Sequence, residues 1–282
     1  MIFCIIVIYH PNFETLKKCI ESILPQVEKV ILVNNDIISL LNFSVPKIHI
    51  IQLGENKGIA YAQNKGIEYS LSQDADYVLF SDQDTVYPND FIRKSLACYQ
   101  RHKSEKIAAV VPWFYNENKK QYAKVSFSKV GTASPEKNKD NYLQHAISSG
   151  TFCHISAFNI IGMMNERFFI DWVEIEWCWR AVNIGYKIIC DTTNIIHHDL
   201  GDAYKKVLGR KIVVYSDFRN YYFFRNATYL LLHSHLLNFK EQLSFASYIL
   251  QKSILYFITK GISLKHLKTF FKAVIAGIIN KF

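Results

Sequence analysis

The chain has 282 residues, half of them hydrophobic, which is enough to bury one large core and leave material for a small appendage. The formal net charge is +9, and residues 238–282 contribute +6 of it through seven lysines and one glutamate. Nucleic-acid-binding proteins more often spread basic residues over the folded domain, so this distribution argues against a nucleic-acid partner.

The predicted elements alternate between strand and helix over the first part of the chain. A continuous apolar run at residues 2–8 is typical of a strand buried on both faces, and a helix follows it that ends at Pro25. Further strands are predicted at 29–33, 47–52, 77–80 and 108–111, with helices at 59–71 and 90–99. This alternation predicts an α/β fold with a mostly parallel central sheet flanked by helices.

Polar loops follow these predicted strands. In open α/β sheets ligands bind beyond the carboxyl ends of the strands, so these loops are the expected binding site. The first glycine is Gly54, which excludes a Gly-x-Gly-x-x-Gly turn after the first strand, and no phosphate-binding Walker A loop is present. A bound nucleotide is therefore expected to be held by side chains and a cation.

The part of the chain after residue 111 is less regular. Residues 113–147 are polar and weakly periodic, which predicts a long loop or irregular β segment that covers the site or binds an acceptor. A helix is predicted at 155–161, and an acidic helix begins after Asp171 as its N-cap. In that helix Glu176 precedes Arg180 by four residues, the spacing of an intrahelical ion pair.

Two carboxylates separated by one residue, Asp82 and Asp84, follow the strand predicted at 77–80. Hard oxygen ligands of this kind suit Mg²⁺ or Mn²⁺, which in turn bind the phosphate oxygens of a nucleotide. The alternative is a surface turn, where aspartates are common.

Several segments, in this order, resemble family 2 glycosyltransferases, and in particular their bacterial rhamnosyltransferase-like branch. They are VIYHPN (7–12), LVNND (32–36), ENKGIAYAQNKGI (55–67), LFSDQD (79–84), SSGT (148–151), FFIDWVEIEWCWR (168–180), HDLGD (198–202) and YYFFRN (221–226). The resemblance spans about residues 2–226 and implies a GT-A fold, the nucleotide-diphospho-sugar transferase fold.

The resemblance also implies roles for residues at the strand ends. Tyr9 would flank the base or ribose, and Asp36 would accept a hydrogen bond from the pyrimidine N3–H. Asn56, Gly58 and Asn64 form a cluster that would lie along the nucleotide. For Asn56 the alternative is turn chemistry beside Gly58.

Glu174 is the candidate general base. Inverting transfer requires a base that removes the proton of the acceptor hydroxyl as this attacks the anomeric carbon. Family members usually have aspartate here, and glutamate reaches one methylene further. The alternative role for Glu174 is a capping box with Asp171.

Two further candidates depend on the resemblance. His198 would complete the cation site begun by Asp82 and Asp84, although a lone histidine more often packs in a core. Arg225 would neutralise the diphosphate of the donor, as would Arg219, unless these side chains stack on Tyr221 or Phe224.

The chain divides into a catalytic domain, residues 1–237, and a basic extension, residues 238–282. The extension alternates lysines with apolar residues, so no uncharged apolar run in it is long enough to span a membrane. This pattern predicts one or two amphipathic helices on an anionic membrane surface. The alternative is packing on the catalytic domain or on a second subunit as a homodimer. The six scattered cysteines and the lack of a visible export signal predict a cytoplasmic protein, peripheral on the inner face of the plasma membrane.

The sequence therefore predicts an inverting glycosyltransferase that moves a sugar onto a lipid-linked saccharide or a surface polysaccharide. The resemblance implies L-rhamnose from dTDP-rhamnose as the donor. The alternatives are a UDP-hexose or UDP-N-acetylhexosamine donor, or a nucleotide-sugar-binding scaffold without turnover.

Overall fold

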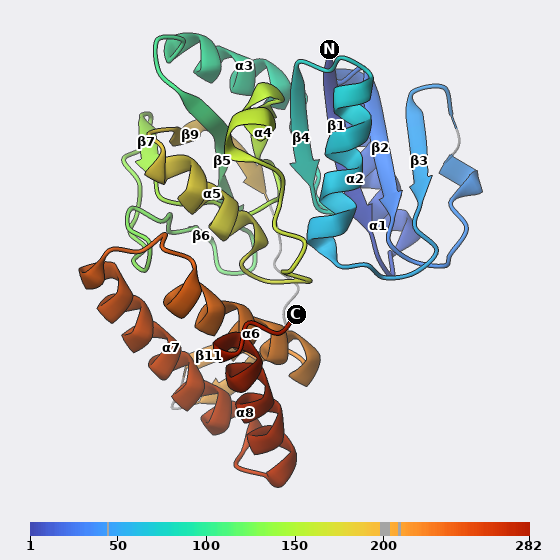
Figure 1. Cartoon of the computed structure of the whole chain (residues 1–282). Coiled ribbons are helices and arrows are strands. Elements are labelled where there is room, and N and C mark those ends of the chain that lie inside the picture. The colour runs from blue at the N-terminus through green and yellow to red at the C-terminus, as the bar shows by residue number, and fades with distance from the viewer. Residues whose placement is uncertain (44, 198–203, 208–209) are drawn as a thin grey trace.

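The apolar run at the start of the chain forms strand β1 (Ile2–Ile8), which lies inside a nine-stranded sheet (Figure 1). The computed structural model describes residues 1–43, 45–197, 204–207 and 210–282. Side chains of β1 alternate between two cores, with Phe3 and Ile5 on one face of the sheet and Cys4, Ile6 and Ile8 on the other. Burial on both faces explains why the run is apolar at every position.

The N-terminal half of the sheet is parallel. Strands β2 (Lys29–Asn34), β3 (Ile48–Gln52) and β4 (Tyr77–Ser81) join β1 in the order β3-β2-β1-β4. Helices α1 (Phe13–Ile23) and α3 (Phe91–Arg101) cover one face, and α2 (Ile59–Ser72) covers the other. Short 3₁₀ turns lie at Leu24–Gln26 and Leu41–Phe43. This half confirms the predicted α/β alternation.

The C-terminal half of the sheet mixes directions and continues the order as β4-β8-β5-β9-β7. Strand β8 (Phe152–His154) is antiparallel to both β4 and β5 (Ile107–Asn116). Strand β9 (Lys187–His197) is parallel to β5, whereas β6 (Gln121–Tyr122) and the edge strand β7 (Asp140–Leu143) pair antiparallel with β5 and β9 respectively. The segment 113–147 is therefore irregular β structure that includes the end of β5, β6 and β7.

Helices α4 (Ser156–Ile161) and α5 (Val173–Asn183) lie on the same face of the sheet as α2, where Phe158 and Trp177 join the larger core. Layers of helices on both faces of a central sheet make this an α/β fold, as the sequence predicted. The helix predicted at 155–161 is confirmed.

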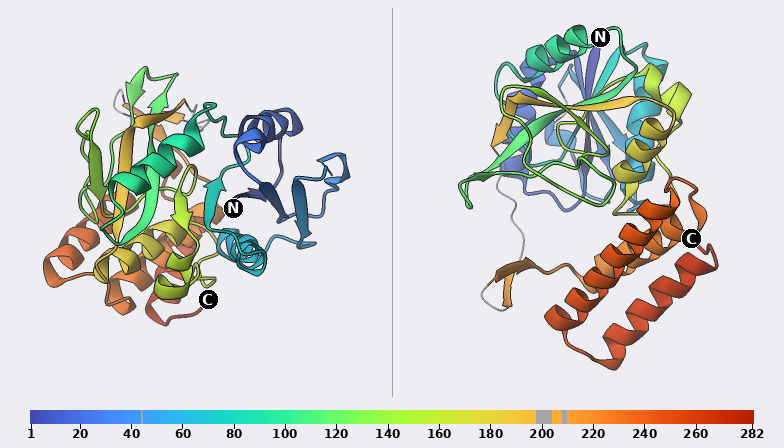
Figure 2. Two further views of the ribbon diagram at one scale, coloured as in Figure 1. Left: turned by 90° about the horizontal axis from the view of Figure 1, so that it is seen from above. Right: turned by 90° about the vertical axis from the view of Figure 1, so that its left-hand side faces the viewer.

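A helical appendage projects from the sheet (Figures 1 and 2). After an antiparallel pair, β10 (Tyr204–Val207) and β11 (Arg210–Val213), it consists of α6 (Asp217–His233), α7 (Phe239–Lys260) and α8 (Leu264–Ile278). Helices α7 and α8 both pack on α6. At Gly277 of α8 the approach is so close that a Cβ would meet the carbonyl oxygen of Arg225 at 2.5 Å.

The predicted domain division at residue 238 falls on Asn238, the N-cap of α7, whose side chain accepts from Glu241 in a capping box. None of the helices in the described ranges has both the length and the apolar character needed to cross a membrane.

Candidate functional site

A polar cavity of about 590 Å³ opens beyond the carboxyl ends of the parallel strands. The loops after β1, β2, β3 and β4 all contribute to it, and the start of α6 faces them. Among the residues predicted for the site, the structure brings together Tyr9, Asn56, Gly58, Asp82 and Asp84 in this lining.

The Asp82–Asp84 loop is held by its middle residue. The Gln83 side chain accepts from the backbone N–H of Tyr9 and donates to the Tyr9 carbonyl, both at 3.0 Å. The Asp82 backbone N–H lies 3.4 Å from Ser149 Oγ. Gln83 therefore fixes the loop against the end of β1, and its two acidic neighbours line the cavity with half-buried (Asp82) and exposed (Asp84) side chains.

These two carboxylates are the residues that could hold a divalent cation at the cavity. Their oxygens match the preference of Mg²⁺ and Mn²⁺, and Asp84 is accessible. His198, the third predicted ligand, lies outside the described residues. A separate group, Cys98, His102 and Asp140, lies close enough together to suggest a metal, but Arg101 already donates to both Asp140 oxygens at 2.8 Å.

Asp36 follows β2 and contacts the loop after β1 through a hydrogen bond from His10. Its carboxylate is buried, accepts from the backbone N–H groups of His10 (3.0 Å) and Ile37 (2.7 Å), and does not line the cavity. The His10 N–H bond is the main cause that lowers the Asp36 pKa. Asp36 is thus an ionised anchor for the loop that carries Tyr9.

Asn56 has turn chemistry, the alternative considered from the sequence. Its side-chain oxygen accepts from Asn35 Nδ2 and from the Gly58 N–H, both at 3.0 Å. Gly58 begins α2 with φ +87°, and a Cβ there would meet the Phe169 carbonyl oxygen at 2.6 Å. This position therefore requires glycine.

Asn64 is buried under the site and does not line it. Its amide donates to the Met164 carbonyl at 3.0 Å and to Glu166 at 2.8 Å, and accepts from the Met164 N–H at 2.9 Å. Asn64 therefore fastens α2 to the segment before α5.

Glu174 lies in the first turn of α5. Gln63 donates to Glu174 Oε1 at 3.5 Å and to Ser148 Oγ at 2.7 Å, and Gln63 and Ser148 both line the polar cavity. Burial raises the pKa of Glu174, and the charge of Asp82 raises it further, whereas the bond from Gln63 lowers it. A carboxyl with a raised pKa beside an acidic loop is the environment expected of a general base.

The prediction that Asp171 caps this helix is wrong. The N-cap is Trp172, and both residues have left-handed backbone, φ +62° at Asp171 and +67° at Trp172. The Asp171 carboxylate instead accepts from Arg219 at 3.0–3.2 Å, so no capping box with Glu174 forms. The predicted Glu176–Arg180 ion pair is present at 2.9 Å.

The two arginines of α6 have different surroundings. Arg219 lines the polar cavity, paired with Asp171. Arg225 is buried outside it, donates to the Arg167 carbonyl at 2.8 Å, and stacks on the rings of Tyr222 and Phe282. The sequence made both arginines candidates for the donor diphosphate, and the structure brings Arg219 to the cavity but not Arg225.

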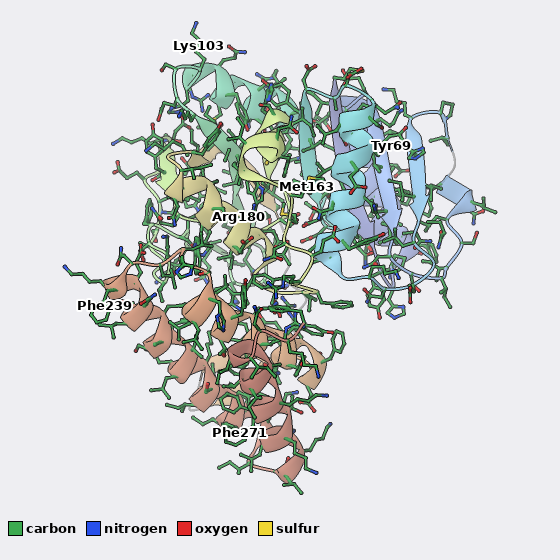
Figure 3. The ribbon with its side chains drawn as sticks, viewed as in Figure 1. Tyr69, Lys103, Met163, Arg180, Phe239 and Phe271 are labelled. Atoms are coloured by element: carbon green, nitrogen blue, oxygen red, sulfur yellow. The ribbon has the colours of Figure 1, made fainter. Side chains whose placement is uncertain are left out.

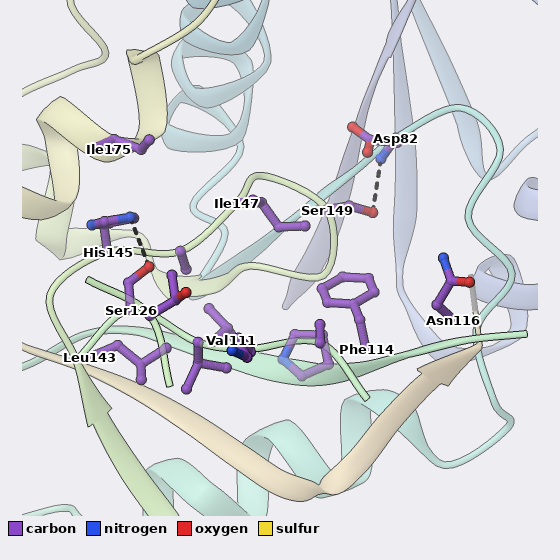
Figure 4. Close-up of a pocket in the computed structure, with 16 residues that line it drawn as sticks. Asp82, Val111, Phe114, Asn116, Ser126, Leu143, His145, Ile147, Ser149 and Ile175 are labelled. Atoms are coloured by element: carbon purple, nitrogen blue, oxygen red, sulfur yellow. Dashed lines mark hydrogen bonds between the residues drawn. The ribbon is translucent and has the colours of Figure 1, made fainter. Parts of the chain in front are cut away.

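A second cavity, of about 380 Å³, meets the first at Asp82 (Figure 4). Its walls come from β5 and the irregular segment 123–147, with Ile175 of α5 at one side, and are largely apolar. Glu174 lines neither cavity itself, but its partner Gln63 lines the polar one and the next residue in the helix, Ile175, lines the apolar one. The sequence hinted at this cavity only through the weak periodicity of residues 113–147.

Comparison with known proteins gives one family. The sequence model of the family "Glycosyl transferase family 2" matches residues 4–161. The dTDP-rhamnosyl transferase RfbF of Shigella flexneri is 34% identical over 247 residues, which cover 83% of this chain and 81% of RfbF.

Solved structures with similar folds share little sequence. TarS residues 1–349 of S. aureus, in complex with UDP-GlcNAc, superpose with a TM-score of 0.63 at 15% identity over 99% of this chain and 82% of that one. GalNAc-T7, crystallised with UDP, GalNAc and Mn²⁺, gives a TM-score of 0.57 at 12% identity, and this chain spans 58% of its length. At such identities the likeness concerns the fold, which is that of GT-A glycosyltransferases.

Proposed function

The chain belongs to glycosyl transferase family 2, as a rhamnosyltransferase-like enzyme, and from this premise we propose that it transfers L-rhamnose from dTDP-rhamnose with inversion. The acceptor is a lipid-linked saccharide or a growing surface polysaccharide. The donor assignment draws its support from RfbF, whose name states a dTDP-rhamnosyl activity.

One observation carries the reaction type: the polar cavity at the strand ends and the apolar cavity beside it share Asp82, and Glu174 is hydrogen-bonded to Gln63 in the wall of the polar cavity. The polar cavity suits a nucleotide-diphospho-sugar, and the apolar one suits an acceptor. Asp82 and Asp84 would hold Mg²⁺ or Mn²⁺, which when bound supplies positive charge for the diphosphate leaving group.

Transfer then proceeds in one displacement. The acceptor hydroxyl oxygen attacks the anomeric carbon of the donor sugar, and its proton passes to the Glu174 carboxylate. The bond from that carbon to the diphosphate oxygen breaks, and the nucleoside diphosphate leaves with the bonding electrons. Gln63 orients Glu174 by its hydrogen bond, and Arg219 offers a guanidinium at the wall of the donor cavity.

Calorimetric titration with dTDP-rhamnose, and with UDP-hexoses and UDP-N-acetylhexosamines, tests the donor in the presence and absence of Mg²⁺ or Mn²⁺. We expect cation-dependent binding of the dTDP-sugar and its loss in Asp84→Ala. Asp90→Ala, which removes another acidic side chain after β4 that does not line the cavity, is the control. Unchanged donor affinity in Asp84→Ala would contradict a cation bound by Asp82 and Asp84. Tighter binding of a UDP-sugar would make that sugar, and not dTDP-rhamnose, the donor.

The product distinguishes an enzyme from a binding scaffold. An acceptor incubated with dTDP-rhamnose should gain a sugar whose anomeric configuration, read by NMR, is opposite to that of the donor. Donor binding without any transfer to a panel of lipid-linked acceptors would favour the scaffold.

We also propose that the appendage holds the enzyme on an anionic membrane surface, at the inner face of the plasma membrane. Exposed apolar side chains recur along α7 and α8, as Phe239 and Phe271 illustrate (Figure 3). Exposed lysines lie among them, including Lys240, Lys268 and Lys272. Apolar insertion combined with lysine attraction to anionic lipid fits a lipid-linked acceptor.

A further inference from the structure

The apolar cavity has a hydrogen-bonded polar pair at the end away from Asp82, in addition to Asn116, Lys124 and Thr132 elsewhere in its lining. Ser126 and His145 lie there together beside Leu143 and Val111, whereas Asp82 and Ser149 lie at the other end, near the donor cavity (Figure 4). The volume of about 380 Å³ falls in the range of small-molecule sites, ~300–1,000 Å³.

Hydrogen bonds fix the direction of the protons at this end. The Trp179 Nε1–H can only donate, and its partner at 3.3 Å is His145 Nδ1, which must therefore be the unprotonated nitrogen. Burial lowers the pKa of His145 to about 4, so the ring is neutral at physiological pH and its proton is on Nε2. That Nε2–H donates to Ser126 Oγ at 2.8 Å.

The Ser126 hydroxyl can consequently donate a hydrogen bond of its own. Its oxygen accepts from His145, and no other residue in the described ranges takes the O–H. The side chain is buried and lines the cavity, so the expected acceptor is an atom of a ligand.

A ligand group for this place needs an oxygen that accepts and an apolar end. A sugar hydroxyl can accept from Ser126 but has no apolar end to pack against Leu143 and Val111. An acetamido group has a carbonyl oxygen that accepts and a methyl that packs on these side chains, while its one N–H donor stays next to the sugar ring to which it is bonded.

We propose that this cavity binds the acetamido group of an N-acetylated amino sugar at the end of the acceptor, with its carbonyl oxygen accepting from Ser126 and its methyl against the apolar wall. This inference rests on the proposed function for the identity of the cavity as the acceptor side. Ser126 is then a specificity-determining residue, positioned through His145 and Trp179, and takes no part in bond breaking.

The test uses the full chain and matched acceptors that differ only at C2. Polyprenyl-diphosphate-linked N-acetylglucosamine and N-acetylgalactosamine are compared with glucose and galactose on the same carrier. Binding is measured by calorimetry without donor, and transfer from dTDP-rhamnose is measured separately. We expect wild type to bind at least one acetamido sugar about tenfold more tightly than its hydroxyl counterpart.

Ser126→Ala should weaken binding of that acetamido acceptor about five- to tenfold, in line with one lost hydrogen bond, and raise its KM with little change in kcat. Binding of the hydroxyl counterpart should hardly change. Ser128→Ala is the control, since Ser128 is exposed in the same segment and bonds only its own turn.

Equal binding of both acceptors by wild type, or an equal loss on both in Ser126→Ala, overturns the inference. If the acetamido preference is present but dTDP-rhamnose gives no product, the proposed donor fails while the acceptor inference stands.

Discussion

Glu174 occupies surroundings that oppose its ionisation, and the proposed reaction needs it ionised. Replacing it with glutamine keeps the size and removes the base. We expect Glu174→Gln to bind dTDP-rhamnose normally and to lose ~10²–10⁴-fold in kcat, the usual contribution of a general base. Single-turnover kinetics at saturating donor measure this. Near-normal turnover would move the base to another residue.

The pH dependence has a defined sign. Because burial and then Asp82 raise the pKa of Glu174, the active carboxylate is lost as pH falls through a value above that of an ordinary glutamate. The Gln63 bond opposes this shift, so Gln63→Leu should raise the pKa and move the acidic limb of kcat/KM to higher pH.

Gln73→Leu is the matched control, because Gln73 is exposed at the far end of the same helix. Its pH profile should coincide with that of wild type. A Gln63→Leu profile that keeps its acidic limb in place would show that Gln63 does not act on Glu174.

The start of α2 illustrates how an element shapes the site. Gly58 has positive φ and no room for a Cβ beside Phe169, whereas Gly54 has positive φ (+76°) and open space around it. Gly54→Ala should cost only ~1–2 kcal/mol for the left-handed backbone. Gly58→Ala should cost about 3 kcal/mol or more, because overpacking adds to the strain, and should weaken donor binding. Urea unfolding and donor titration compare the two, and equal losses would contradict the role of the Phe169 contact.

At the scale of elements, the sequence predicted best where pattern and length were both strong. The buried positions of the parallel strands β1, β2 and β4 are apolar except at the carboxyl ends of β2 and β4, Asn34 and Ser81, so their α/β arrangement was predictable. Strands β8 and β7 have three and four residues, too short to show a period, and pair antiparallel through contacts distant in sequence. The mixed direction of the second half could not be predicted for this reason.

The site residues, too, were predicted well where they follow the parallel strands and poorly where they depend on contacts distant in sequence. The loops after the parallel strands were located because strand ends converge at one edge of a sheet. The cap of α5 was missed because Asp171 pairs with Arg219, 48 positions away, and two left-handed residues precede the helix. The choice between Arg219 and Arg225 depends on which face of α6 meets the cavity, which the aromatic-rich segment does not reveal by periodicity.

For the whole molecule, the appendage is the part that we propose to bind a membrane surface. On α8, Phe271 and Ile275 are 55% and 53% exposed, one helical turn apart, with Lys268 and Lys272 beside them. Such a face gains free energy in a bilayer interface through apolar burial, and the lysines add attraction to anionic lipid. We therefore expect the protein to sediment with vesicles of phosphatidylglycerol and phosphatidylethanolamine, and less so in 0.5 M salt, which shortens the screening length.

A double variant, Phe271→Glu with Ile275→Glu, should reduce vesicle binding at least tenfold while titration with soluble donor stays normal, because neither residue lines the donor cavity. The control is Ile160→Glu on α4, a residue 58% exposed outside the appendage, which adds a negative charge without touching α7 or α8. If the double variant still sediments with vesicles, the membrane contact lies elsewhere. If wild type does not bind vesicles but is a dimer by light scattering, and the double variant is a monomer, this face is instead an interface between two copies of the chain.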